Sequence, residues 1–124
     1  MSKILLSIKP EYAKRILDGS KKYEFRKRLA QETVDSIVIY SSSPQMAVVG
    51  EVEVIESIAM SPSALWEFTK KEAGISRTKY RTYFKDCKIA YAYKLGNVTI
   101  YENPKALKDL GLFQAPQSFI YLAK

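Results

Sequence analysis

Short apolar segments alternate with charged ones along the whole 124-residue chain. The run 4–8 is almost entirely apolar and stops at Lys9-Pro10, which predicts a short buried strand because proline cannot continue a central β-ladder. Apolar residues then recur at helical spacing, and Gly19 follows them. We therefore expect a helix that starts at Pro10 and ends at this glycine.

Residues 22–28 alternate in the manner of a half-buried strand. Tyr23 and Phe25 point to one face, which we assign to the core. The opposite face is charged, with Lys22, Glu24, Arg26 and Arg28.

The rest of the chain continues this mixture of strands and short helices. We expect strands over 36–40, 46–60, 89–95, 98–101 and 118–122, helices starting at Pro62 and after Ser76, and a short helix over 105–110. Gly50 indicates a bulge or a close approach of two backbones, and Gly96-Asn97 the turn of a hairpin. With about six strands and two or three helices, the predicted class is α+β around a small, partly closed mixed β-barrel.

The formal net charge of +7 is arranged in blocks along the chain. Residues 1–28 hold nine Lys or Arg against three acids, 29–69 hold six acids and no base, and 70–94 hold eight bases against two acids. If the two basic blocks fold together, they form one positive face that attracts phosphates. The alternative is that each block is the solvated side of a helix or hairpin.

Missing residue types limit the chemistry further. The chain has no histidine and only one cysteine, Cys87, so histidine-dependent triads and an internal disulfide are excluded, and we expect neither a metal nor a cofactor. We recognise no signal peptide and no apolar stretch long enough to span a membrane. The expectation is a single domain, residues 1–124, located in the cytoplasm without a membrane partner.

Gly19, Lys21, Glu24 and Arg26 stand in the spacing G-x-K-x-x-E-x-R, directly after the first predicted strand and helix. With this order, and with Pro-Gln-Ser at 116–118 before the last strand, the sequence resembles the ASCH domains, which are named for homology to activating signal cointegrator-1 and are related to the PUA-like barrels. The resemblance spans essentially the whole chain. It implies a PUA-like β-barrel with a cleft that receives the motif's side chains, and a role in binding RNA or another single-stranded nucleic acid.

By this resemblance the binding roles fall on Lys21, Glu24 and Arg26. Arg26 offers a planar fork to a phosphate or a guanine edge, Lys21 a point charge, and Glu24 an acceptor for exocyclic amino groups. The alternative is that Glu24 and Arg26 pair with each other and only hold the barrel together. The full set of predicted nucleic-acid-binding residues is Lys9, Lys21, Glu24, Arg26, Arg28, Arg77, Arg81, Gln117 and Ser118.

Residues 79–85 interleave basic and aromatic side chains. On a helix, Tyr80 and Phe84 form one stripe, so we assign both to the core and leave Arg77, Arg81 and Lys85 as the exposed bases that hold phosphates. Trp66 lies in an apolar helix start, and we assign it to the core as well, rather than to a base-stacking surface.

Two other functions stay open. Some ASCH proteins are amidohydrolases acting on N4-acetylcytidine, with a threonine nucleophile where this chain has Glu24. A carboxylate is a poor substitute for an alcohol nucleophile, which favours binding over catalysis. A hydrolase would have to use Lys21 and Glu24 through a water, with Glu67 or Glu72 near a second catalytic position. The third hypothesis is a regulatory domain that recruits a protein through an exposed apolar patch.

Overall fold

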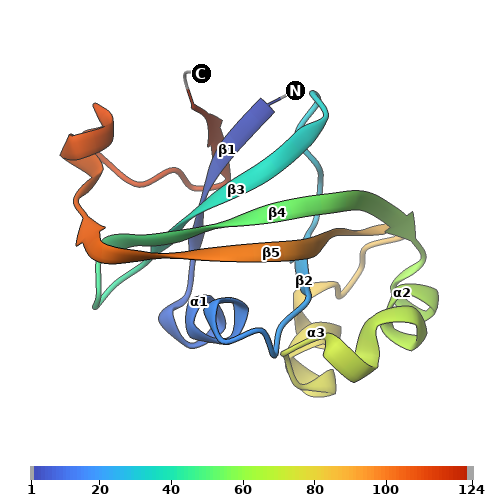
Figure 1. Ribbon diagram of the computed structural model, residues 1–124. Helices are drawn as coiled ribbons and strands as arrows, with labels where there is room; N and C mark the ends of the chain where they lie inside the picture. Colours follow the sequence, from blue (N-terminus) through green and yellow to red (C-terminus); the bar gives the residue numbers. More distant parts are fainter. Residues whose placement is uncertain (1, 123–124) are drawn as a thin grey trace.

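The computed structural model describes residues 2–122, which form a curled six-stranded sheet with three α-helices (Figure 1). In chain order the elements are β1 (Ser2–Ile8), α1 (Pro10–Leu17), β2 (Tyr23–Arg26), β3 (Val34–Ser41), β4 (Ala47–Met60), α2 (Pro62–Thr69), the 3₁₀ turn η1 (Lys70–Glu72), α3 (Arg77–Tyr83), β5 (Ala90–Lys105), the 3₁₀ turn η2 (Leu107–Leu110) and β6 (Phe119–Tyr121). The predicted α+β class and the predicted number of strands and helices are confirmed.

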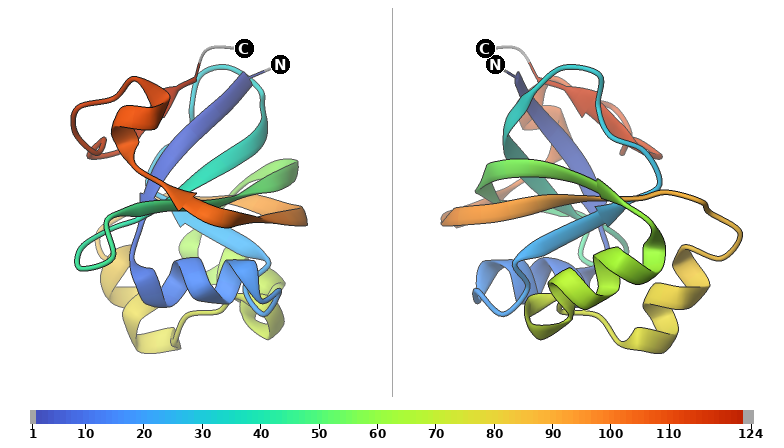
Figure 2. Two further views of the ribbon diagram at one scale, coloured as in Figure 1. Left: turned by 60° about the vertical axis from the view of Figure 1, so that its left-hand side comes forward. Right: turned by 90° about the vertical axis from the view of Figure 1, so that its right-hand side faces the viewer.

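The strands are ordered β2-β5-β4-β3-β1-β6 in the sheet. β1 and β3 are parallel, and every other neighbouring pair is antiparallel. β4 and β5, of 14 and 16 residues, cross the whole molecule, and the sheet curls along them into a half-barrel. Figure 2 shows α1, α2 and α3 on one side of this sheet, so the helices share one surface of the molecule.

Three apolar clusters hold the layers together. The first joins α1 to β1, β3 and β4, where Ile4 and Ile16 are almost completely buried. The second joins α2 and α3 to β2 and the start of β5 around the fully buried Leu65. The third lies on the other face of β1, where Leu5 is covered by the segment that follows β5. β1 is therefore buried on both faces, which explains its almost continuous apolar sequence.

Serine residues begin two of the helices. The hydroxyl oxygen of Ser61 accepts a hydrogen bond from the backbone N–H of Ala64 at 3.3 Å, and that of Ser76 accepts one from the N–H of Lys79 at 3.1 Å. Both bonds satisfy an N–H that the helix itself leaves unpaired. The predicted helix start at Ser76 is confirmed.

The predicted hairpin turn at Gly96-Asn97 is wrong, because β5 continues through these residues to Lys105. β4 is long enough to pair with β5 on both sides of Gly96, and the pairing shifts register around Val54. The carboxylate of Glu53 accepts a hydrogen bond from the N–H of Asn97 at 3.3 Å. The glycine therefore marks an irregularity within one strand, where no side chain obstructs Glu53.

Gly50 lies in β4 where α1 and β5 approach most closely, as its position in the sequence predicts. A Cβ atom there would lie 2.6 Å from the carbonyl oxygen of Thr99 and 2.9 Å from a methyl carbon of Leu17. Both neighbours belong to packed elements, so the added atom would displace backbone or helix.

We expect Gly50→Ala to lower the free energy of unfolding by about 1–3 kcal/mol because of this overlap. Urea denaturation measures the change. Ser57→Ala on an exposed position of the same strand serves as the control, with an expected change within about 0.5 kcal/mol. Equal losses in the two variants would contradict the close approach at Gly50.

Candidate nucleic-acid interface

A cleft of about 490 Å³ lies between the end of β1, α1, β2 and α3. Its lining combines charged side chains with aromatic rings. The charged residues are Lys9, Lys21, Glu24, Arg26 and Lys79, and the rings are those of Tyr12, Phe25 and Tyr83. Three of the lysine and arginine residues come from the first basic block of the sequence and Lys79 from the second, so folding brings the two blocks together at this cleft.

Lys21 is positioned by the turn between α1 and β2. Gly19 adopts a φ of +86°, and the N–H of Lys21 then donates to the carbonyl oxygen of Arg15 at 2.9 Å. Gly74, with a φ of +66°, packs directly against the Lys21 side chain, where a Cβ atom would collide with it. The guanidinium of Arg15 donates to the carbonyl oxygen of Gly74 at 2.9 Å and joins these two loops.

The amine of Lys21 is buried, with 3% of the residue exposed. Its Nζ atom donates to the carbonyl oxygen of Ala73 at 2.8 Å and lies 4.8 Å from the ring centre of Phe25 and 5.3 Å from that of Tyr12. Burial lowers the pKa of Lys21 from its ordinary value of 10.5 to about 8, although the negative charge of Glu24 acts in the opposite direction. The cleft therefore contains an amine that loses its proton near pH 8, well below the usual range of lysine.

Glu24 and Arg26 form an ion pair at 3.1 Å, with side chains that are 10% and 15% exposed. The guanidinium of Arg26 also donates to the carbonyl oxygen of Ser7 at 3.2 Å, which joins β2 to the end of β1. Of the predicted charged face of β2, Glu24 and Arg26 thus point into the cleft, whereas Lys22 and Arg28 do not line it. The pairing that we considered as an alternative role is present, and the same two residues line the cleft.

Two polar atoms in the cleft have no partner among the residues that the structure describes. They are the Nε atom of Arg26 and the hydroxyl oxygen of Ser7, and both are buried. A buried N–H or hydroxyl without a partner is unfavourable, and a ligand that supplies one relieves the cost. The Nε atom of Arg26 therefore offers a donor next to the carboxylate of Glu24, and the hydroxyl of Ser7 can either donate or accept.

The rim of the cleft is cationic. Lys9 is exposed, and the ammonium of Lys79 pairs with Glu11 at 3.5 Å and lies 6.0 Å from the ring centre of Tyr12. Both side chains of the Lys79–Glu11 pair are largely exposed, so the pair is weak and opens easily.

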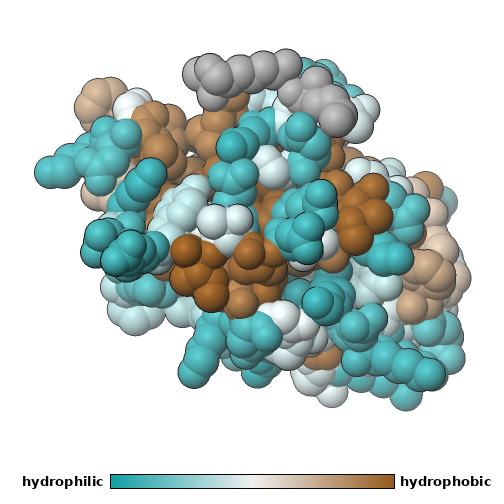
Figure 3. Space-filling model, viewed as in Figure 1, coloured by the Kyte–Doolittle hydropathy of each residue, from teal (hydrophilic) through white to brown (hydrophobic). Residues whose placement is uncertain are grey.

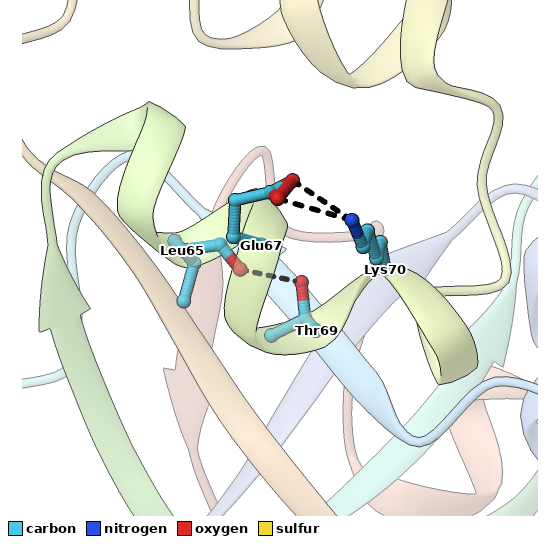
Figure 4. Close-up of polar contacts among 4 residues, drawn as sticks. All are labelled: Leu65, Glu67, Thr69 and Lys70. Carbon is cyan, nitrogen blue, oxygen red and sulfur yellow. Dashed lines mark hydrogen bonds and ion pairs between the residues drawn. The ribbon is translucent and has the colours of Figure 1, made fainter.

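The remaining predicted binding residues lie elsewhere. Arg77 and Arg81 line a second pocket between α2 and α3, whereas Arg28, Gln117 and Ser118 are exposed and line neither pocket. Figure 4 shows the carboxylate of Glu67 bound to the ammonium of Lys70, at 3.0 and 3.1 Å. Glu67 also faces the second pocket, and Glu72 lines neither, so neither carboxylate joins Lys21.

Several residues of the cleft lie outside the predicted binding set, and the polar or aromatic ones most relevant to a ligand include Ser7, Tyr12, Lys79 and Tyr83. Tyr12 shares a helix face with core residues, and Lys79 and Tyr83 belong to a helix far along the chain. The interleaving of bases and aromatics over 79–85 was a signal for the last two. Burial raises the pKa of the Tyr83 hydroxyl, so it stays protonated as a donor at neutral pH.

No helix within 2–122 is long and apolar enough to cross a membrane. The same residues contain no group of three or more His, Cys, Asp or Glu side chains placed to hold a metal ion.

The lowered pKa of Lys21 predicts how stability depends on pH. Between about pH 8 and 10.5 the unfolded chain keeps a proton that the folded protein has released, so the free energy of unfolding rises with pH. The rise is at most about 1.4 kcal/mol per pH unit. We expect it in the wild type and not in Lys21→Met, measured as the difference between the two urea denaturation curves.

Taking this difference cancels the titration of the tyrosines, which both proteins share. Lys88→Met removes one exposed positive charge and is the control. If Lys21→Met and the wild type change in parallel with pH, the amine does not have the environment described.

Comparison with known proteins shows to which family the chain belongs. The family model of the ASCH domain matches residues 6–105. A protein named ASCH domain-containing ribonuclease from Zymomonas mobilis is 32% identical over 97% of this chain and 84% of that protein. A protein named ATP synthase subunit alpha from Ureaplasma parvum is 30% identical over 96% of this chain, which spans only 15% of that protein.

The fold comparison agrees. A crystal structure of ASCH from Zymomonas mobilis superposes with a TM-score of 0.92, at 31% identity, over 99% of this chain and 89% of that one. The family model covers most of the chain, and the similarity to the Zymomonas protein extends over nearly all of it. The chain belongs to the ASCH domain family.

Proposed function

We propose that this ASCH domain binds RNA in the cleft between α1, β2 and α3. The observation that carries the proposal is that aromatic rings, a paired arginine and carboxylate, and rim lysines line one cavity of about 490 Å³. Unpaired RNA bases are recognised by stacking on aromatic side chains and by hydrogen bonds to their edges, while lysine and arginine hold the phosphates.

The interior of the cleft suits a base edge that carries a donor next to an acceptor. The carboxylate of Glu24 accepts from an exocyclic amino group, and the unpartnered Nε atom of Arg26 donates to a ring nitrogen or carbonyl oxygen. The rings of Tyr12, Phe25 and Tyr83 supply apolar walls. Lys9 and Lys79 at the rim are placed to contact the flanking phosphates.

The relative named as a ribonuclease supports a function that involves RNA. The similarity covers 84% of that protein, so it includes most of the chain that carries the name.

The rim lysines give the first test. We expect Lys9→Gln and Lys79→Gln each to weaken the binding of a single-stranded RNA by up to about fivefold, because each loses one phosphate contact. The slope of log K against log salt should become shallower by about 0.7 for each lost contact. Fluorescence anisotropy with a labelled oligoribonucleotide measures both quantities.

Lys88→Gln is the matched control, since it removes the same charge from an exposed lysine outside the cleft. Binding that falls equally in all three variants would show attraction to the overall charge and no contact in the cleft. Arg26→Ala is a poorer probe, because it leaves the carboxylate of Glu24 buried without its partner and costs stability.

RNA cleavage is the second candidate, favoured by Lys21 in addition to the name of the relative. Attack of a ribose 2′-oxygen on the adjacent phosphorus breaks the bond to the 5′-oxygen and leaves a 2′,3′-cyclic phosphate. A base must take the proton from the 2′-hydroxyl, and an acid must protonate the departing 5′-oxygen. Lys21, with a pKa of about 8, is suited to accept the proton, and the cationic Arg26 to stabilise the charge on the phosphoryl oxygens. The hydroxyl of Tyr83, which burial keeps protonated, is the donor in the cleft for the departing 5′-oxygen.

Incubation with an oligoribonucleotide and its all-deoxy counterpart tests this second candidate. We expect cleavage of the RNA alone, at a rate that rises with pH up to about 8 as the amine loses its proton, and loss of cleavage in Lys21→Met. Thermal melting checks that the variant folds, and anisotropy checks that it still binds. Equal cleavage by wild type and variant would indicate a contaminating nuclease and sink the assignment.

The amidohydrolase and protein-recruitment hypotheses stay predictions. Turnover of N4-acetylcytidine compared with a Glu24→Gln variant tests the first. Large apolar residues are exposed on several elements, including Ile55 of β4 and Ile100 of β5. On the face that Figure 3 draws, the apolar areas are separated by hydrophilic residues.

A further inference from the structure

A second pocket, also of about 490 Å³, lies between α2 and α3. Its walls include the aromatic residues Trp66 and Phe84 and the basic residues Arg77 and Arg81. The side chain of Tyr80, a residue of α3, reaches toward α2. Its ring centre is 4.8 Å from that of Trp66, and its hydroxyl donates to the carbonyl oxygen of Pro62 at 2.8 Å. This bond fixes the spacing of α2 and α3, so the pocket is a built part of the fold.

Helix α3 separates the two pockets. Thr78, Lys79, Thr82 and Tyr83 face the cleft described above, whereas Arg77, Tyr80, Arg81 and Phe84 face the second pocket. Residues three or four apart share a helix face, so the two sets lie on opposite sides of one short helix. An α-helix with its side chains is about 10–12 Å across. A single strand of a few nucleotides is long enough to cross this width and reach both pockets.

The charges of the second pocket suit a polyanion. Arg77 and Arg81 are exposed, and within residues 2–122 neither forms an ion pair or donates a side-chain hydrogen bond. The one carboxylate in the lining, that of Glu67, is bound by Lys70 and partly neutralised (Figure 4). Two free guanidinium groups therefore stand beside an aromatic surface.

We propose that the second pocket is a nucleotide subsite, which holds a base against Trp66 and the neighbouring phosphates at Arg77 and Arg81 when an RNA strand bound in the first cleft passes over α3. This proposal rests on the proposed function. It extends the RNA-binding surface from the first cleft to the second pocket, so that affinity depends on the length of the RNA. Base stacking tolerates any base, so this contact contributes affinity without selecting a sequence.

Trp66 is the only tryptophan, so its fluorescence reports on this pocket directly. We expect a short oligocytidylate to quench Trp66 and to bind about fivefold or more tightly than cytidine monophosphate, because the longer strand adds the second stacked base. Cytosine carries the exocyclic amino group that Glu24 accepts from, so cytidine monophosphate occupies the first cleft and leaves Trp66 fluorescence nearly unchanged.

Arg77→Gln/Arg81→Gln is the test variant. It should lose the gain in affinity of the oligomer and lower its salt slope by about 0.7 for each arginine, with the affinity for cytidine monophosphate unchanged. Lys85→Gln/Lys88→Gln removes the same charge from exposed lysines outside both pockets and is the matched control. Circular dichroism confirms that both variants are folded.

The two proposals fail in different ways. Equal affinity for monomer and oligomer, or oligomer binding that depends on Lys9 and Lys79 without quenching Trp66, overturns the subsite and leaves RNA binding in the first cleft standing. A loss of oligomer affinity that the control variant shares also overturns it. Quenching that depends on the two arginines supports it, and binding of neither probe overturns both proposals.

Discussion

The site depends on one buried contact, the hydrogen bond from the Lys21 amine to the carbonyl oxygen of Ala73. An ammonium group that is removed from water costs free energy, and the rings of Phe25 and Tyr12 together with this hydrogen bond offset part of that cost. The contact ties the turn after α1 to the loop between η1 and α3. The guanidinium of Arg15, which donates to the carbonyl oxygen of Gly74, and the N–H of Lys22, which donates to that of Glu72, join the same two segments and support this contact.

The same burial determines the electrostatics of the cleft. Because the amine of Lys21 is desolvated, its pKa falls toward neutral pH, while the Glu24–Arg26 pair keeps a negative and a positive group within reach of a ligand. Such a combination of an amine with a shifted pKa and a largely buried ion pair is typical of functional sites. At these sites the burial of charged groups costs stability but adjusts their pKa values for binding or catalysis. The rim lysines and the two arginines on the far face of α3 extend the positive field outward, along the direction in which a polyanion would lie.

Local patterns predicted most of the fold correctly. The apolar run of β1, the alternation of β2, and the serine before α3 each depend on residues close in sequence, and each element is present. The error at Gly96-Asn97 has a tertiary cause: glycine followed by asparagine suits a tight turn, but β4 runs alongside and pairs with β5 on both sides. The core assignment of Trp66 holds in part, because its ring packs against the cluster that joins α2 and α3, but the side chain is only partly buried and also lines the second pocket. Whether a side chain is covered depends on neighbours that the local pattern does not contain.

The features of the candidate site also fall into two groups, those that the sequence predicts and those that depend on the tertiary structure. The sequence by itself determined the motif residues Lys21, Glu24 and Arg26 and the family resemblance, because their spacing follows from the geometry of one turn and one strand. Only the tertiary structure decided that Lys21 is buried, that Glu24 and Arg26 pair within a cleft, and that α3 closes it with Lys79 and Tyr83. These facts depend on contacts between segments about 50 residues apart, such as Lys21 with Ala73, which no local periodicity encodes.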